Sequence, residues 1–240
     1  MSGPSPGAVS SASSSVPGAT PTTSTYYQCA DPAAGDALVV LAHGAGAGQH
    51  HPFMVGVAQA VAARGVDVAT FDFPYVHDRR KLPDRQPALE ACFEHVVSWA
   101  RAHGEARGRG RLFVGGKSMG GRIATHLGAR GTAGLAGIIA LGYPLRPPGR
   151  TVRDRGAHLA LVHQPLLVVQ GTRDAFGAPA DIRDATATTP GPVTIVSIEG
   201  GDHSFAVRGT PARQVLDGLG DTVVAWIAGL VSGRFEAELH

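Results

Sequence analysis

One serine lies in a setting that favours nucleophilic chemistry. Ser118 is the central residue of GKSMG at residues 116–120, directly after the apolar stretch RLFVG at residues 111–115. The following GRIATHLGAR is compatible with a helix. A sharp turn from strand to helix exposes the serine oxygen at the sheet edge, and glycines let the helix approach the strand. The motif alone is a weak signal because it also occurs in purely structural turns. Its position between a predicted strand and a predicted helix is what indicates a nucleophile.

An acid and an imidazole follow two later apolar stretches. Asp174 comes after PLLVVQ at residues 165–170, and His203 comes after VTIVSI at residues 193–198. Alone, each would be interpreted as a turn or surface residue. Both are expected at the carboxyl ends of strands, where open α/β sheets bind ligands, and the order Ser, Asp, His is one known triad order. We therefore predict a catalytic triad with Ser118.

The triad prediction assigns a role to each group. Neutral His203 accepts the Ser118 proton and returns it to the leaving group, while Asp174 holds the imidazole tautomer. Asp202 is the competing acid, but a residue adjacent to His203 in sequence is badly placed to reach its ring.

The glycine-rich stretch HGAGAG at residues 43–48 follows the first apolar stretch of the chain. Acyl transfer by serine creates an oxyanion that needs preorganised N–H donors. We expect the backbone N–H groups of Ala45 and Met119 to supply them. A phosphate-binding loop is the alternative interpretation, but the stretch lacks both G-x-x-x-x-G-K-[ST] and G-x-G-x-x-G.

Several residues near these motifs are candidates for lining a substrate pocket. They are Gly44, Phe73, Tyr75, Tyr143 and Phe176.

His43, His50 and His51 are the candidate metal ligands. No carboxylate accompanies them, so we predict no metal and no other cofactor. His43 is expected to brace its loop, and dialysis against a chelator is expected to leave the reaction rate unchanged.

Short apolar stretches alternate with helical patterns, which predicts the fold class. Amphipathic helices are expected over residues 87–100 and after Pro211. Continuous apolar stretches are typical of parallel strands covered on both faces, so the chain predicts an α/β fold with a doubly wound, mostly parallel sheet. The predicted strands are residues 37–42, 66–71, 111–115, 135–141, 165–170 and 193–198.

The domain organisation is expected to be simple. Residues 1–25 contain no Lys, Arg, Asp or Glu and are rich in Ser, Pro, Gly and Thr. We predict a disordered tail there, with a hydrolytic domain over residues 26–240, and we expect removal of the tail to leave stability unchanged. The segment 143–164 is too short for a cap domain. The tail lacks the features of a secretory signal or a transit peptide, so a cytoplasmic location is expected.

The bulk composition excludes several classes of function. The chain has 240 residues, 43% of them hydrophobic, and a formal net charge of +2. This charge is too small to indicate nucleic-acid binding, and the basic run at residues 101–111 is interpreted as a solvated connection. The two cysteines form no disulfide framework, and no apolar run has the length expected of a membrane span. No sequence feature indicates the oligomeric state.

The motifs together resemble a known family. HGAGAG, GGKSMGGR, GYPLRPPG, GTRDAFG and GGDHSF occur in this order between residues 36 and 230. They are similar to small dienelactone-hydrolase-like α/β-hydrolases, particularly the testis-expressed hydrolase-like proteins, and Lys117 in place of the commoner His is part of the match. The resemblance implies an α/β-hydrolase fold without a cap domain.

For activity, the resemblance implies a serine hydrolase that acts on small carboxylic esters or thioesters. Because true dienelactone hydrolases use Cys where this chain has Ser118, their lactone substrate is not carried over. Three alternatives stay open: a cofactor-free perhydrolase, a peptidase, and a non-catalytic interaction module, since some relatives serve in larger complexes. An open site without a cap predicts a preference for short acyl chains.

Overall fold

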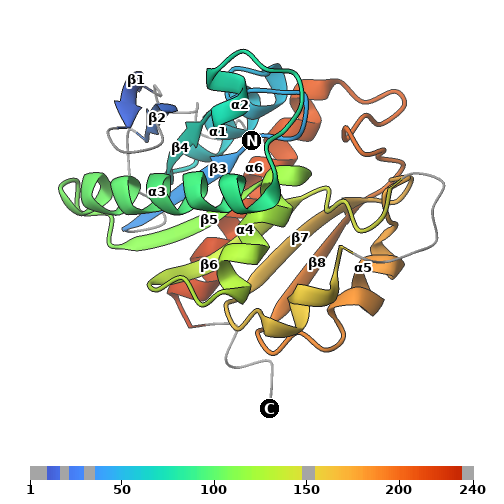
Figure 1. The fold of residues 1–240 in the computed structure, drawn as a ribbon. Coiled ribbons are helices and arrows are strands. Elements are labelled where there is room, and N and C mark those ends of the chain that lie inside the picture. The colour runs from blue at the N-terminus through green and yellow to red at the C-terminus, as the bar shows by residue number, and fades with distance from the viewer. Residues whose placement is uncertain (1–9, 17–21, 30–35, 148–154, 234–240) are drawn as a thin grey trace.

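The computed structural model describes residues 10–16, 22–29, 36–147 and 155–233. Its centre is an eight-stranded sheet with the order β1-β2-β4-β3-β5-β6-β7-β8 (Figure 1). All pairings from β4 to β8 are parallel, whereas β2 pairs antiparallel with β1 and with β4. The strands are β1 (Ser10–Val16), β2 (Thr22–Gln28), β3 (Ala37–Ala42), β4 (Asp67–Phe71), β5 (Arg111–Lys117), β6 (Leu135–Leu141), β7 (Leu166–Gly171) and β8 (Val193–Ile198).

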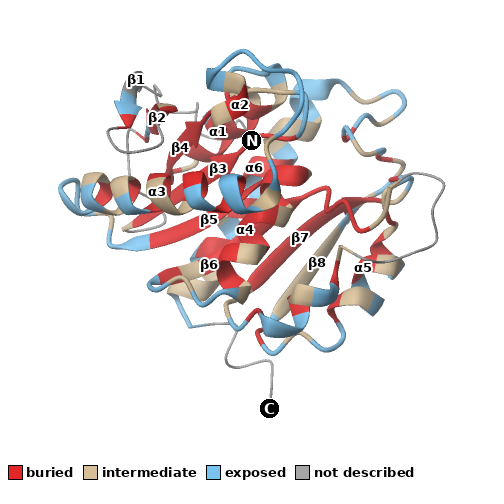
Figure 2. Cartoon of the chain, in the orientation of Figure 1, coloured by how far each residue is buried: buried red, intermediate tan, exposed pale blue. Residues whose placement is uncertain are grey.

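Helices cover both faces of the sheet and bury its central strands (Figures 1 and 2). One apolar core lies between the sheet and the helices α3 and α4. A second lies on the opposite side, between the sheet and the helices α1 and α6. This architecture confirms the predicted doubly wound sheet and all six predicted strands. The helices are α1 (Pro52–Ala62), α2 (Pro74–His77), α3 (Gln86–Glu105), α4 (Met119–Ala129), the 3-10 helix η1 (Ala157–Leu161), α5 (Pro179–Thr186) and α6 (Ala212–Val231).

The connection between β6 and β7 contains only η1 among its described residues. No cap domain is evident there, as predicted, and the described part of this connection leaves the carboxyl edge of the sheet without a covering layer.

Helix α6 is the one described helix that is long and apolar enough to cross a membrane. No such segment was predicted from the sequence. In the fold, Leu219, Val223 and Ile227 of α6 are buried in the core shared with α1. The Arg64 guanidinium, just after α1, bonds the Asp221 carboxylate at 2.5 Å. This packing explains the apolar composition of α6 through burial in the fold.

The amino-terminal segment differs from the expected disordered tail. Strands β1 and β2 lie within or overlap residues 1–25, while residues 1–9 and 17–21 lie outside the described part. Thr22, Ser24 and Thr25 are buried, and the Ser24 hydroxyl donates to the Thr70 carbonyl at 2.9 Å. The prediction considered only apolar burial, whereas this strand is held by a ladder of backbone hydrogen bonds and by its hydroxyls.

A buried carboxylate fixes the end of β2 against β4. Asp67 accepts hydrogen bonds of 2.8 Å from the Tyr26 hydroxyl, the Cys29 N–H and the Arg109 guanidinium. Burial alone would raise the pKa of Asp67, but these bonds, chiefly that from Arg109, lower it overall. The amino-terminal strands are therefore tied to the domain by charge-assisted contacts.

This attachment predicts that deletion of residues 1–25 destabilises the protein. The deletion removes β1 and, at the edge of β4, the Ser24–Phe71 and Thr25–Thr70 pairs. Each lost hydrogen bond is worth about 1 kcal/mol. We expect the melting temperature to fall by at least about 5 °C, measured by circular dichroism against a truncation of residues 1–9. An unchanged melting temperature would show that the two strands contribute nothing.

Candidate active site

Ser118 occupies the turn between β5 and α4 in a strained backbone conformation. Its φ is +50° and its ψ is −113°, a region that non-glycine residues rarely adopt. The Ser118 N–H donates to the Leu141 carbonyl at 2.9 Å, which ties the turn to β6. The serine thus lies at the carboxyl edge of the sheet, ahead of the first turn of α4.

Glycines make this turn sterically feasible. A Cβ built on Gly116 or on Gly120 would lie 2.2 Å from the carbonyl oxygen of Ala42 in β3. No side chain fits at that distance, so β5 and the first turn of α4 can pack directly on the backbone of β3. The glycines of the pentapeptide are therefore required by packing, as its strand–turn–helix context indicated.

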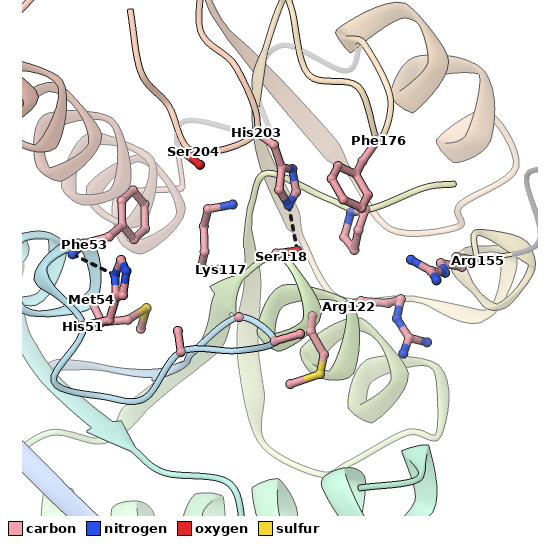
Figure 3. Close-up of a pocket in the computed structure, with 15 residues that line it drawn as sticks. His51, Phe53, Met54, Lys117, Ser118, Arg122, Arg155, Phe176, His203 and Ser204 are labelled. Atoms are coloured by element: carbon pink, nitrogen blue, oxygen red, sulfur yellow. Dashed lines mark hydrogen bonds between the residues drawn. The ribbon is translucent and has the colours of Figure 1, made fainter. Parts of the chain in front are cut away.

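The structure brings Ser118, Asp174 and His203 into one hydrogen-bonded chain, of which Figure 3 shows the bond between His203 and Ser118. His203 Nε2 lies 2.8 Å from Ser118 Oγ, and His203 Nδ1 lies 2.8 Å from Asp174 Oδ2. The Asp174 carboxylate is buried and also accepts the Phe176 N–H at 2.8 Å and the Gln170 amide at 2.9 Å. These donors hold the carboxylate aimed at the imidazole.

Asp202 takes a different role in the loop after β8. Its Oδ1 accepts the Ser204 N–H at 2.8 Å and the Ala206 N–H at 2.9 Å. The carboxylate therefore shapes the loop that carries His203, and no bond from it to the His203 ring is found among the described residues.

The glycine-rich loop after β3 lies against Ser118. A Cβ on Gly44 would lie 3.6 Å from the Ser118 Cβ, and Ala45 lines the cavity in front of the serine. Met119 is the first residue of α4, so its N–H has no acceptor within the helix. Both N–H groups assigned to the oxyanion hole thus belong to residues that border the cavity.

The buried His43 side chain holds this loop in place through two hydrogen bonds. Its Nδ1 lies 2.8 Å from the Gly44 carbonyl, and its Nε2 lies 3.1 Å from the Phe73 N–H. Since a carbonyl only accepts and an N–H only donates, these partners require the neutral Nδ1–H tautomer. Burial lowers the pKa of His43, which agrees with a neutral ring.

A buried polar network that the sequence analysis missed fixes the other end of the loop. Asp72 accepts the Gln49 N–H at 2.8 Å and the Gln49 amide at 3.1 Å. The same amide donates to the Thr23 hydroxyl at 2.9 Å, which links the loop to β2. The position of Asp72 directly after a predicted strand was the signal available in the sequence.

The cavity at this edge has a volume of about 450 Å³. Of the predicted pocket residues, Gly44 and Phe176 line it, and the Phe176 ring stacks on His203 at 4.1 Å between centroids. The lining residues that the sequence analysis did not propose for the pocket are Ala47, His51, Phe53, Met54, Lys117, Arg122, Pro144, Arg155 and Ser204.

The prediction that Phe73, Tyr75 and Tyr143 line the pocket is wrong. All three are buried in the core and are at most 1% exposed. Phe73 and Tyr75 pack edge-on against His43, with ring centroids 5.1 and 5.8 Å away. Tyr143 donates its N–H to the Gln170 side chain at 2.7 Å. Their side chains fill the interior beneath the loops because apolar burial there outweighs exposure in an open cleft.

The histidines considered as candidate metal ligands do not form a metal-binding group. No group of three or more His, Cys, Asp or Glu side chains able to hold a metal occurs among the described residues. His51 instead accepts the Phe53 N–H at 3.3 Å as the cap of α1.

The fold and this site define a class of protein. The chain belongs to the family described as the alpha/beta hydrolase domain, whose sequence profile matches residues 35–228. Membership of this family supports a hydrolase.

Solved structures show the same fold at low sequence identity. A dienelactone hydrolase from Anabaena variabilis has a TM-score of 0.72 and 18% identity, over 91% of this chain and 96% of that one. A serine hydrolase homologue from Coxiella burnetii has a TM-score of 0.71 and 16% identity, over 89% and 96%. XC6422 from Xanthomonas campestris, a serine hydrolase without a lid, has a TM-score of 0.67 and 21% identity, over 94% of each chain.

Glycine-to-alanine substitutions at a packed and at an open helical position should have opposite effects on stability. Gly120→Ala places a methyl group against the Ala42 backbone, so the free energy of unfolding should fall by about 2 kcal/mol or more. Gly218→Ala in α6, where nothing lies within 4 Å, should raise it by up to about 1 kcal/mol through helix propensity. Chemical denaturation measures both. Equal stabilisation by the two substitutions would contradict the close packing of α4 on β3.

Proposed function

We propose that this protein is a serine hydrolase that cleaves carboxylic esters or thioesters with short acyl groups through an acyl-enzyme. The observation that carries the proposal is the hydrogen-bonded chain from Asp174 through His203 to Ser118, with 2.8 Å at each step. Family membership and the cavity in front of Ser118 support it further. The expected partner is a small molecule, and a cytoplasmic location stays a prediction.

The proposed reaction begins with proton transfer from Ser118 to His203 Nε2. Ser118 Oγ attacks the acyl carbon, and the carbonyl oxygen becomes an oxyanion that the N–H groups of Ala45 and Met119 would stabilise. The tetrahedral intermediate collapses when His203 protonates the leaving alcohol or thiol. Water then attacks the acyl-enzyme with the same imidazole as base, which releases the acid and restores the serine.

Asp174 supports this cycle through the charge on His203. Its carboxylate bonds to Nδ1, so Nε2 faces Ser118 as the proton acceptor, and the negative charge stabilises the imidazolium that forms. The buried amide of Gln170 and the Phe176 N–H hold the carboxylate in place.

Substitution of the nucleophile tests the proposal directly. Ser118→Ala should lower kcat for an activated aryl ester by on the order of 10³-fold or more, with an unchanged circular dichroism spectrum. Ser98→Ala, at an exposed hydroxyl of α3, is the matched control and should retain full activity. Retained hydrolysis in a folded Ser118→Ala protein would contradict the assignment of the nucleophile.

The open cavity predicts a limited acyl length. Each buried methylene contributes about 0.8 kcal/mol, but a chain that extends beyond the cavity remains in water and contributes little. We expect kcat/KM across p-nitrophenyl esters to peak at about two to four acyl carbons and then to decrease. A steady increase out to long chains would instead require an apolar tunnel.

A further inference from the structure

Lys117 directly precedes the nucleophile, and its side chain lies in the cavity beside Ser118 (Figure 3). The ammonium is 5.4 Å from the ring centroid of Phe205 and 5.9 Å from that of Phe53. These two rings stack on each other with centroids 5.7 Å apart. Aromatic faces attract a cation, so the pair holds the ammonium at a fixed place in the cavity wall.

No carboxylate neutralises this ammonium by direct contact within the described part of the chain. Asp174 and Asp202 act on it at longer range, but the oxygens of Asp174 bond to His203 and its other donors, and Asp202 Oδ1 bonds to backbone N–H groups. Burial lowers the pKa of Lys117 to about 8 despite these two negative charges. A partly desolvated cation without a bonded anion is costly, and an anionic ligand would remove that cost.

The rest of the cavity has the same sign of charge. Arg122 and Arg155 also line it, and no Asp or Glu does so among the described lining residues. Arg122 donates to the Gln86 side chain at 2.9 Å, so part of its hydrogen-bonding capacity is directed away from the cavity. A concave site lined by cations concentrates anions, which favours a negatively charged substrate.

We propose that Lys117 binds an acidic group of the substrate, so that the preferred substrates are esters or thioesters that also carry a free carboxylate. This inference rests on the proposed function. A Cβ on Gly142 would lie 3.0 Å from Lys117 Nζ and 3.6 Å from His203 Nδ1, so the ammonium and the imidazole lie on the same side of Gly142. The carboxylate must therefore be only a few bonds from the scissile carbonyl.

Matched ester pairs test the preference for an acid. Monomethyl glutarate carries a free carboxylate on the acyl side, and its amide counterpart is neutral and similar in shape. 3-Acetoxypropionate and its amide place the same groups on the alcohol side. We expect kcat/KM for the acid to exceed that for the amide by about tenfold in at least one pair, because a charge-assisted hydrogen bond is stronger than a neutral one.

Two lysine variants test whether Lys117 causes the preference for the acid. Lys117→Met keeps the apolar stem and should reduce the ratio of acid to amide to about one. Lys81→Met alters the only other lysine of the chain, which is exposed, and should keep the tenfold ratio. In the wild type, the ratio should fall as the pH rises through about 8, since the Lys117 ammonium loses its charge there.

A measurement on the wild-type chain covers the case in which Lys117→Met does not fold. Reductive methylation with 13C-formaldehyde keeps the lysine charges and gives separate NMR signals, which Lys81→Met assigns. Addition of glutarate should raise the pKa of the Lys117 signal and leave that of Lys81 unchanged. No change at tens of millimolar glutarate would overturn the proposal.

Other outcomes separate this inference from the proposed function. Hydrolysis of neutral esters that depends on Ser118, without any preference for acids, would overturn the anion site and leave the hydrolase intact. A preference that survives Lys117→Met but is lost in Arg155→Met would also overturn the assignment to Lys117. A glutarate-dependent pKa shift in a protein inactive toward every ester would support the anion site and contradict the proposed function.

Discussion

The close approach of the first turn of α4 to the backbone of β3 is the constraint on which the site depends. Gly116 and Gly120 both face the Ala42 carbonyl at a distance that excludes any side chain. This contact places Ser118 at the carboxyl edge of the sheet with a positive φ, and directs the first N–H groups of α4 toward the cavity. Larger residues at these two positions would move the helix, the serine and the N–H donors together.

The remaining parts of the site are positioned by strand ends and by buried hydrogen bonds. Strands β7 and β8 are parallel neighbours, so the loops that carry Asp174 and His203 meet at one edge. Gln170 fixes the acid, His43 fixes one end of the glycine-rich loop, and Asp72 with Gln49 fixes the other end. These groups do not touch the reacting atoms, but they preorganise the charges and donors that would do so.

The same network changes the interpretation of the amino-terminal strands. Thr23 in β2 shares the Gln49 amide with Asp72, and the end of β2 is held by Asp67. A segment rich in serine and threonine residues thus supports the loop in front of Ser118. The cavity in front of this loop is lined by Lys117, Arg122 and Arg155.

The sequence predicted the features that follow from local patterns. Continuous apolar stretches gave six strands, and the turn residues around Ser118, Asp174 and His203 placed these three at one edge of the sheet. Strands β1 and β2 were missed because most of their residues are polar. Their stability comes from strand pairing, of β1 with β2 and of β2 with β4, rather than from an apolar pattern.

The residues that line the cavity were also predicted poorly, because tertiary packing decides which side chains reach it. Phe73, Tyr75 and Tyr143 turn into the core, whereas Phe53 and Met54 of α1 reach the cavity. Which side of a loop an aromatic ring packs on is decided by the layers around it, and no spacing rule in a single sequence contains that information.

Labelling with a fluorophosphonate probe, followed by peptide mapping, tests the central claim most directly. The probe reacts with a serine whose hydroxyl is activated by a neighbouring base. The account predicts one adduct per chain, on the peptide that contains Ser118, and labelling slower by at least about 10²-fold in His203→Ala, since general-base assistance is worth 10²–10⁴-fold. A folded protein that remains unlabelled, or that is labelled at a different serine, would contradict it.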